Sequence, residues 1–171
     1  MNSGRPPRHQ AGFTYVAMLI AVAVIGVGLV ATSEIWSQSR QREQEQELLF
    51  AGDQFRQAIA LYYLRTPGPA KQYPAKLEDL LQDKRYPNMQ RYLRKPYADP
   101  MTGKTEWGLV TAPGGGIMGV YSLSNASPIK RGGFRQRDRT FEGATTYQEW
   151  RFFYEPPLVQ QIQKAAAKPA I

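Results

Sequence analysis

The run GFTYVAMLIAVAVIGVGLVATS occupies residues 12–33 and sets the organisation of the whole chain. Residues 10–33 carry no charged side chain, and most of them are Ala, Val, Ile, Leu, Met or Phe. About 20 apolar residues suffice to cross the hydrocarbon core of a bilayer as a helix, so this run predicts a membrane-spanning helix. The next charge, Glu34, marks where that helix is expected to reach water.

The charges before the run predict its orientation. Arg5, Arg8 and His9 precede it, and positive charge favours the cytoplasmic side of a spanning helix. The N-terminus is therefore expected in the cytoplasm, and the chain after about Ser33 outside it.

Two other interpretations of the same residues stay open. A conventional secretory signal peptide also has a basic start and an apolar core, but its core is usually shorter and ends at small residues. Residues 21–23, Ala-Val-Ala, have that form yet lie in the middle of the run. A single-pass anchor that is never processed is the second alternative.

A helical pattern continues beyond the apolar run. Residues 38–47 are strong helix formers without Gly or Pro. Their acidic members are expected on a solvated or intersubunit face: Glu43, Glu45 and Glu47. Apolar side chains then recur in steps of three and four, which places them on one stripe of a helix: Leu48, Ala51, Phe55, Ile59 and Tyr62. Prolines at 67 and 69 end this helix near Arg65, so one helix over residues 13–65 is predicted.

The rest of the chain predicts a small antiparallel sheet. A short helix is expected within residues 73–81, and strands are expected at 106–110, 117–123 and 147–154. Strands joined by short turns favour antiparallel pairing, and one sheet face can cover the apolar stripe of the helix. The predicted fold class is therefore α+β, a long N-terminal helix packed on a sheet of about three strands.

Composition argues against an enzyme. The chain has no cysteine, and His9 is its one histidine. A chain processed after residue 12 would lack the commonest general base and the commonest zinc ligand. We expect no catalytic site, no metal, no cofactor and no small-molecule substrate.

A basic segment follows the second predicted strand. The net charge is +8, and removal of Arg5 and Arg8 with the leader lowers it to +6. Five cations are interspersed with glycines and one aromatic residue, Phe134: Lys130, Arg131, Arg135, Arg137 and Arg139. Such a segment can grip a phosphate backbone, contact an acidic partner subunit, or form a solvated insertion between strands.

The junction at Gly12 and Phe13 resembles the N-terminus of type IV pilins and of the pseudopilins of type II secretion. The residues 73–77, Tyr-Pro-Ala-Lys-Leu, and the Asp-Pro loop at 99–103 look like the region after the long helix in major pseudopilins. The resemblance covers residues 12–124 well and the remainder poorly. The family's calcium loop is not carried over, because residues 125–146 contain only Asp138 and Glu142 as acids.

The resemblance implies a processed, single-pass protein of the bacterial inner membrane. A prepilin peptidase would cut after Gly12 and methylate Phe13, and other pilin or pseudopilin subunits would be the partners. The implied divisions are a basic leader (1–12), a transmembrane and assembly helix (13–33), the periplasmic amphipathic half of that helix (34–66), a globular α+β domain (67–155) and a C-terminal tail (156–171). The implied function is structural, in protein secretion or in a pilus-like fibre.

One position departs from the family pattern. Family members usually carry Glu at the fifth mature position, where it offsets the N-terminal amine inside the filament, and here that position is Ala17. An unpaired buried amine costs several kcal/mol, which a repeated subunit would incur at every contact. We therefore expect a minor subunit. The alternatives are a minor pilin that binds DNA or a surface through residues 130–139, and a bitopic accessory protein that never assembles.

Overall fold

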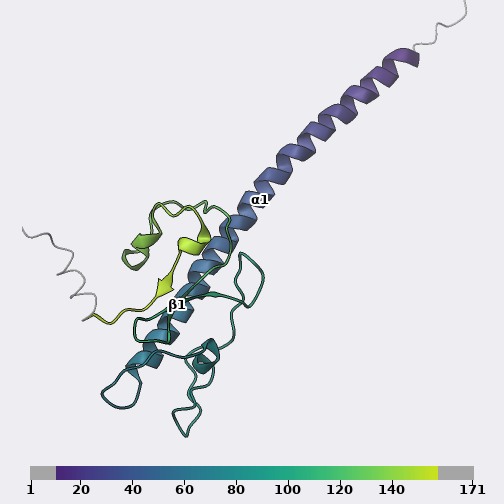
Figure 1. The fold of residues 1–171 in the computed structure, drawn as a ribbon. Helices are drawn as coiled ribbons and strands as arrows, with labels where there is room; N and C mark the ends of the chain where they lie inside the picture. The colour runs from purple at the N-terminus through teal and green to yellow at the C-terminus, as the bar shows by residue number, and fades with distance from the viewer. Residues whose placement is uncertain (1–10, 158–171) are drawn as a thin grey trace, which may run out of the picture. The chain divides into compact units, whose positions relative to one another are not determined.

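The computed structural model describes the backbone of residues 11–157 and the side chains of residues 15–25 and 36–157 (Figure 1). Most of the leader (1–12) and of the tail (156–171) therefore lies outside the described residues. The chain divides into two compact units, residues 1–40 and residues 41–171. Each unit is described by itself.

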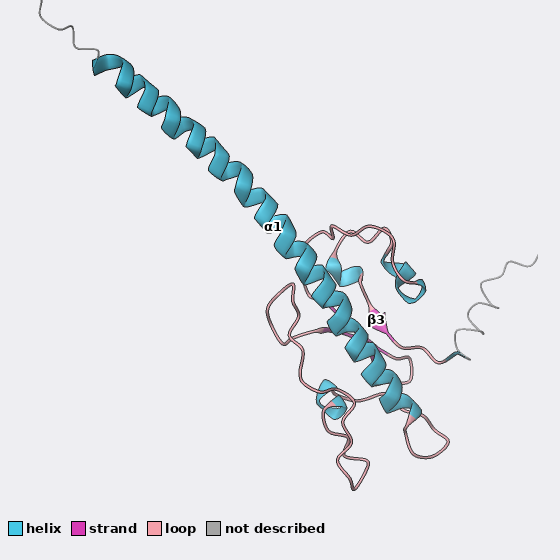
Figure 2. Cartoon of the chain, turned by 180° about the vertical axis from the view of Figure 1, so that it is seen from behind, coloured by secondary structure: helices cyan, strands magenta, loops and turns pink. Residues whose placement is uncertain are grey.

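One helix dominates the described chain. Helix α1 covers Ala11–Leu64, 54 residues, and Figure 2 shows it as one continuous element. The long helix expected over residues 13–65 is thus confirmed, with its end one residue earlier. The helix stops because two prolines follow within five residues of Leu64, and proline cannot continue a helix.

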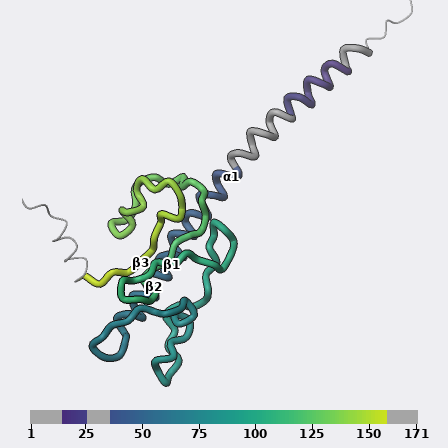
Figure 3. The backbone as a smooth tube through the Cα atoms, in the orientation of Figure 1, coloured from purple at the N-terminus to yellow at the C-terminus, as the bar shows by residue number. Residues whose placement is uncertain are grey.

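A three-stranded antiparallel sheet completes the α+β fold (Figure 3). Its strands are β1 (Gly108–Thr111), β2 (Ile117–Tyr121) and β3 (Phe152–Phe153), in the order β1-β2-β3. Both pairings are antiparallel. The chain turns between β1 and β2 at Gly115 and Gly116, whose φ angles of 86° and 82° suit glycine.

The third strand is much shorter than expected. The sequence predicts a strand over 147–154, but Tyr147–Glu149 forms a 3₁₀ turn and only Phe152–Phe153 is strand. Tyr147 and Trp150 are both completely buried. Two residues three apart point to opposite faces of a strand, whereas a 3₁₀ turn places them on one face. Burial of both rings therefore requires the turn.

Two other expected elements are also shifted. The short helix expected within residues 73–81 is a single 3₁₀ turn, Leu77–Leu80, and the first strand starts at Gly108 instead of 106. Trp107 explains the later start, because its indole is buried and its Nε1 donates to the Tyr97 carbonyl oxygen at 2.8 Å. This bond ties the residue before β1 to the preceding loop.

The core lies between the second half of α1 and the sheet. The predicted apolar stripe from Leu48 to Tyr62 is buried as expected, at 7 % exposure or less throughout. It packs with buried residues of the sheet region, including Trp107, Val120 and Phe152. At about 25 cal/mol per Å² of apolar surface, this burial is the main term that holds the globular unit on the helix.

Gly52 lies directly against the Phe152 ring of β3. A Cβ atom at this position would lie 2.4 Å from the Phe152 ring, which no side chain tolerates. Helix propensity alone favours Ala over Gly by about 1 kcal/mol. The absence of a side chain at position 52 is therefore a packing requirement of β3.

We expect Gly52→Ala to destabilise the chain by about 1–2 kcal/mol, because overpacking a core outweighs the gain in helix propensity. Denaturant unfolding measures this, with Gly114→Ala as the matched control, since a Cβ at Gly114 meets nothing within 4 Å. Stabilisation by Gly52→Ala would show that the ring moves aside freely.

Candidate functional site

The first unit presents an apolar helical surface that nothing in the described chain covers. Every described side chain from residue 15 to residue 25 is exposed. The large apolar ones are more than half exposed: Tyr15, Val16, Met18, Leu19, Ile20, Val22, Val24 and Ile25. Contiguous exposed apolar surface of this kind marks a site of contact with protein or membrane.

Among the described residues, no helix is both long enough and apolar enough to cross a bilayer. The side chains of residues 26–35, which include the second half of the apolar run, are outside the described set.

The predicted cleavage and assembly positions lie at the start of α1. The backbone of Gly12 and Phe13 is helical, and their side chains are outside the described residues. Ala17 is described and exposed. Its methyl group adds to the apolar surface and supplies no carboxylate there.

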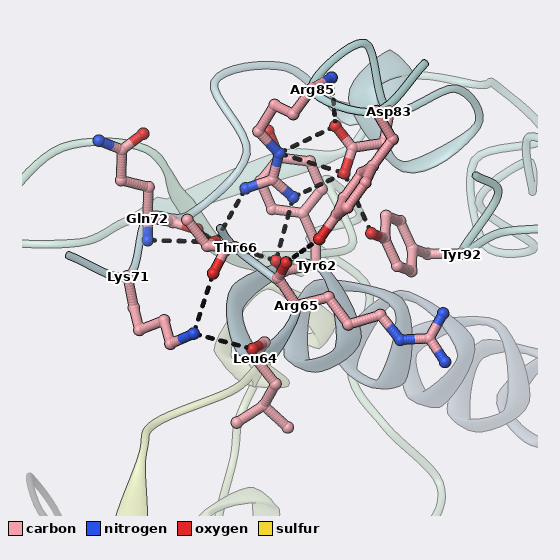
Figure 4. Close-up of polar contacts among 10 residues, drawn as sticks. Tyr62, Leu64, Arg65, Thr66, Lys71, Gln72, Asp83, Arg85 and Tyr92 are labelled. Atoms are coloured by element: carbon pink, nitrogen blue, oxygen red, sulfur yellow. Dashed lines mark hydrogen bonds and ion pairs between the residues drawn. The ribbon is translucent and has the colours of Figure 1, made fainter. Parts of the chain in front are cut away.

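At the other end of α1, polar side chains cap the C-terminus of the helix (Figure 4). The last carbonyl groups of a helix have no partner within the helix, and its C-terminus carries partial negative charge. Arg85 Nη2 donates to the Tyr62 carbonyl oxygen at 3.1 Å, and Lys71 Nζ donates to the carbonyl oxygens of Leu64 and Thr66 at 3.1 and 2.9 Å. Two cations from the following loops thus satisfy the open carbonyls.

Asp83 holds the capping arginine in place. Its carboxylate accepts Arg85 Nη2 at 2.7 Å and the Tyr92 hydroxyl at 3.0 Å, and the Arg85 guanidinium lies 3.5 Å from the Tyr62 ring centroid. Burial alone would raise the pKa of Asp83, but the hydrogen bonds from Arg85 and Tyr92 outweigh it and set that pKa below its ordinary 3.8. The ion pair is therefore intact at neutral pH.

Glu45 anchors the segment before the 3₁₀ turn Tyr147–Glu149 to the helix. Glu45 is 4 % exposed, and its carboxylate accepts hydrogen bonds from the backbone N–H groups of Ile129 and Lys130 at 2.6 and 3.1 Å. The Tyr147 hydroxyl donates to the same oxygen at 2.9 Å and accepts from Gln41 Nε2 at 2.8 Å. The expectation that Glu45 lies on a solvated or intersubunit face is wrong, whereas Glu43 and Glu47 are exposed.

A second polar contact joins the helix to the 3₁₀ segment Gln136–Phe141. Arg56 Nη2 pairs with Asp138 Oδ1 at 2.7 Å, and Arg137 Nη2 pairs with Asp53 Oδ2 at 3.1 Å. Arg56 also lies 3.5 Å from Asp53, so two cations and two carboxylates form one compensated cluster. The spacing of these four residues in the sequence does not predict the cluster.

The structure brings together only part of the predicted basic segment. Lys130, Arg135 and Arg137 line one hollow beside α1, whereas Arg131 lines another with Pro128. Arg139 is exposed and lines neither. Arg137 is already committed to Asp53 and Asp138, so the five cations do not form one continuous strip.

The aromatic residue of that segment faces inward. The Phe134 ring packs edge-on against Phe141 and Trp150 at 5.7 and 5.4 Å between centroids. Lys130 Nζ lies 5.1 Å from the Phe134 centroid. A nucleic-acid base stacking on Phe134 would have to displace these contacts.

Asp99 organises the loop that resembles the pseudopilin Asp-Pro loop. Its buried carboxylate accepts the Met101 N–H at 2.9 Å, the Thr102 hydroxyl at 3.1 Å and the Ser122 hydroxyl at 2.7 Å. These bonds tie the loop to the end of β2. Within residues 15–25 and 36–157, no three acidic, histidine or cysteine side chains gather as a metal-binding group.

The raised pKa values of three tyrosines lead us to expect a loss of stability at alkaline pH. Burial raises the pKa of Tyr73, Tyr92 and Tyr147 from 10.0 to about 12. Their contribution is complete below pH 10.0 and is lost as pH rises towards about 12, because the unfolded chain releases these protons first. We expect the free energy of unfolding in detergent to fall across this window. A constant value while tyrosinate absorbance rises would contradict the assignment.

Comparison of the chain with models of protein families, with curated proteins and with solved structures gives no match.

Proposed function

We propose that this chain is a minor, pseudopilin-like structural subunit of a type II secretion pseudopilus or a type IV pilus-like fibre. It is held in the bacterial inner membrane by its N-terminal helix, with the globular domain in the periplasm. A prepilin peptidase releases the leader after Gly12, and the freed helix packs beside helices of other subunits. Its role is mechanical and associative.

The uncovered apolar surface of residues 15–25 is the observation that carries this proposal. Apolar side chains on all sides of a helix need lipid or other helices around them. A fibre made of bundled helices supplies the second environment after the membrane supplies the first. The glycine and phenylalanine at the start of the run, next to a basic leader, support processing there.

The globular domain is suited to be carried by its helix. Residues 41–64 hold it through the core stripe, the Glu45 anchor and the Arg56–Asp138 ion pair. Apolar and polar contacts at both ends of this helical segment oppose sliding of the domain along it. A force applied to residues 41–64 is therefore transmitted to the globular domain.

Ala17 supports a minor role. A methyl group cannot neutralise a buried N-terminal amine, and that deficit of several kcal/mol recurs at every copy in a uniform fibre. A subunit used once, at a tip or in an initiating complex, incurs it once. We expect few copies per fibre, and Ala17→Glu should raise incorporation. Abundant uniform fibres of the unaltered chain would contradict the minor role.

Photo-crosslinking tests assembly itself. A benzophenone side chain at Leu19, which is 53 % exposed, should give adducts with the N-terminal helix of another subunit in the intact membrane. The matched control places the same group at Arg91, an exposed position on the globular unit. Adducts to lipid alone at position 19 would identify a membrane anchor that does not assemble.

A further inference from the structure

A groove beside α1 combines an exposed phenyl ring with cations that form no ion pair among the described residues. It has a volume of about 370 Å³ and lies between α1 and residues 130–138. We call it the basic groove, and it is lined as follows: Gln46, Leu49, Phe50, Asp53, Lys130, Gly133, Phe134, Arg135, Arg137 and Asp138. All of these residues belong to the second unit.

The helix side of the basic groove includes two apolar residues, Leu49 and Phe50, between Gln46 and Asp53. Phe50 is 58 % exposed, although it lies next to half-buried Leu49. Its ring contacts that of Tyr97 edge-on, at 6.0 Å between centroids. A phenyl ring left this open beside a hollow offers apolar surface to a partner side chain.

The lining of the basic groove carries three cations and two carboxylates, and Arg56, outside the lining, adds a fourth cation to the ion pairs of those carboxylates. Asp53 and Asp138 are matched by Arg56 and Arg137 in the ion pairs described above. In the described part of the chain, no ion pair includes Lys130 or Arg135, which both line the groove. The groove thus offers two apolar side chains together with two uncompensated cations.

We propose that the basic groove binds a segment of a partner subunit in which an apolar side chain stands next to a carboxylate. The apolar side chain packs on Leu49 and Phe50, and the carboxylate pairs with Lys130 and Arg135. The inference rests on the proposed function for the identity of the partner as a fibre subunit. Charge complementarity of this kind fixes the register and choice of partner.

Nucleic acid fits the basic groove less well. A phosphate backbone laid along it would meet the carboxylates of Asp53 and Asp138. Phe134 is half-buried and packs against Phe141 and Trp150, which leaves little of its ring for a base to stack on. A volume of about 370 Å³ admits one or two side chains, near the lower end of the range for ligand sites.

The test uses the full chain in its own membrane, with a benzophenone side chain in place of Phe50. We expect an adduct to another fibre subunit, mapped by mass spectrometry to within about four residues of an Asp or Glu, one helical turn. Lys130→Glu with Arg135→Glu should lower its yield about tenfold or more, because like charges face each other. Arg91→Glu with Arg94→Glu makes the same charge change at exposed positions outside the groove and should leave the yield unchanged.

Each outcome decides. No adduct at Phe50, an adduct that survives the double reversal, or an adduct to DNA or lipid overturns the inference. Thermal unfolding of the reversal variant shows whether it is folded, and Lys130→Gln with Arg135→Gln repeats the test without introducing acid. If the Leu19 adduct forms while the Phe50 adduct does not, the proposed function stands and the groove inference falls. Loss of both adducts removes both.

Discussion

Glu45→Ala should destabilise the chain by about 3 kcal/mol. This is the largest effect we expect from replacing one charged residue in the charged section of α1. The substitution removes the acceptor for the N–H groups of Ile129 and Lys130 and for the Tyr147 hydroxyl. Each buried donor left without a partner costs about 1–3 kcal/mol. The loss would be a large share of a typical stability of about 5–15 kcal/mol. Denaturant unfolding of the full chain in detergent, followed by tryptophan fluorescence, measures it.

The neighbouring acids supply the controls. Glu47→Ala changes an exposed carboxylate on the same helix and should shift stability by no more than about 0.5 kcal/mol. Glu45→Gln keeps one carbonyl acceptor and should fall between the two. If Glu45→Ala and Glu47→Ala cost the same, the carboxylate does not hold the segment at 129–147 in place.

Arg85→Ala should cost a similar amount, about 3 kcal/mol, at the opposite end of the globular unit. The substitution leaves the carboxylate of Asp83, a residue that is 2 % exposed, without its cation. It also removes a hydrogen-bond donor from the Tyr62 carbonyl at the end of α1. Breaking a buried ion pair by removing one partner typically costs about 3–5 kcal/mol. The Tyr92 hydroxyl still donates to Asp83, which keeps the expected loss at the lower end.

The pH dependence gives this prediction a distinctive signature. The pKa of Asp83 is lowered in the folded state, so its ion pair stabilises the fold above pH 3.8 and that contribution is lost as pH falls through the folded pKa. The difference in the free energy of unfolding between the original chain and Arg85→Ala should therefore become smaller in acid. Lys84→Ala, at an exposed neighbouring position, should show neither the loss nor the pH dependence. If that difference stays constant as the pH is lowered, Arg85 stabilises the fold through packing alone.

Periodicity was enough to predict the helix and its buried stripe. From Leu48 to Tyr62 one residue type, apolar, recurs in steps of three and four, and no competing signal interrupts it. The same steps continued backwards from Leu48 reach Glu45 and Gln41, the two polar residues that anchor the later segment. The spacing that places Glu45 and Gln41 on the buried stripe is therefore present in the sequence. A charged residue among other charged residues nevertheless favours the prediction of a solvent-exposed face.

The short elements could not be read from pattern alone. Residues 147–154 alternate like a strand, yet Tyr147 and Trp150 share one buried face, which depends on what surrounds them. The cap on α1 unites residues 62, 83, 85 and 92, and nothing in their local sequence indicates that meeting. Likewise, Phe134 among five cations suggests a stacking platform until its neighbours Phe141 and Trp150 are known. Long-range packing decides these positions.

The mass of the N-terminal peptide from the membrane-derived protein tests the proposed identity most directly. The account predicts that the mature chain begins at Phe13, with the leader of residues 1–12 removed by cleavage after Gly12. A methyl group on the new amine would add the second mark of the pathway. A membrane-embedded population that begins uniformly at Met1 would contradict processing, and with it the proposal that a freed apolar helix builds a fibre.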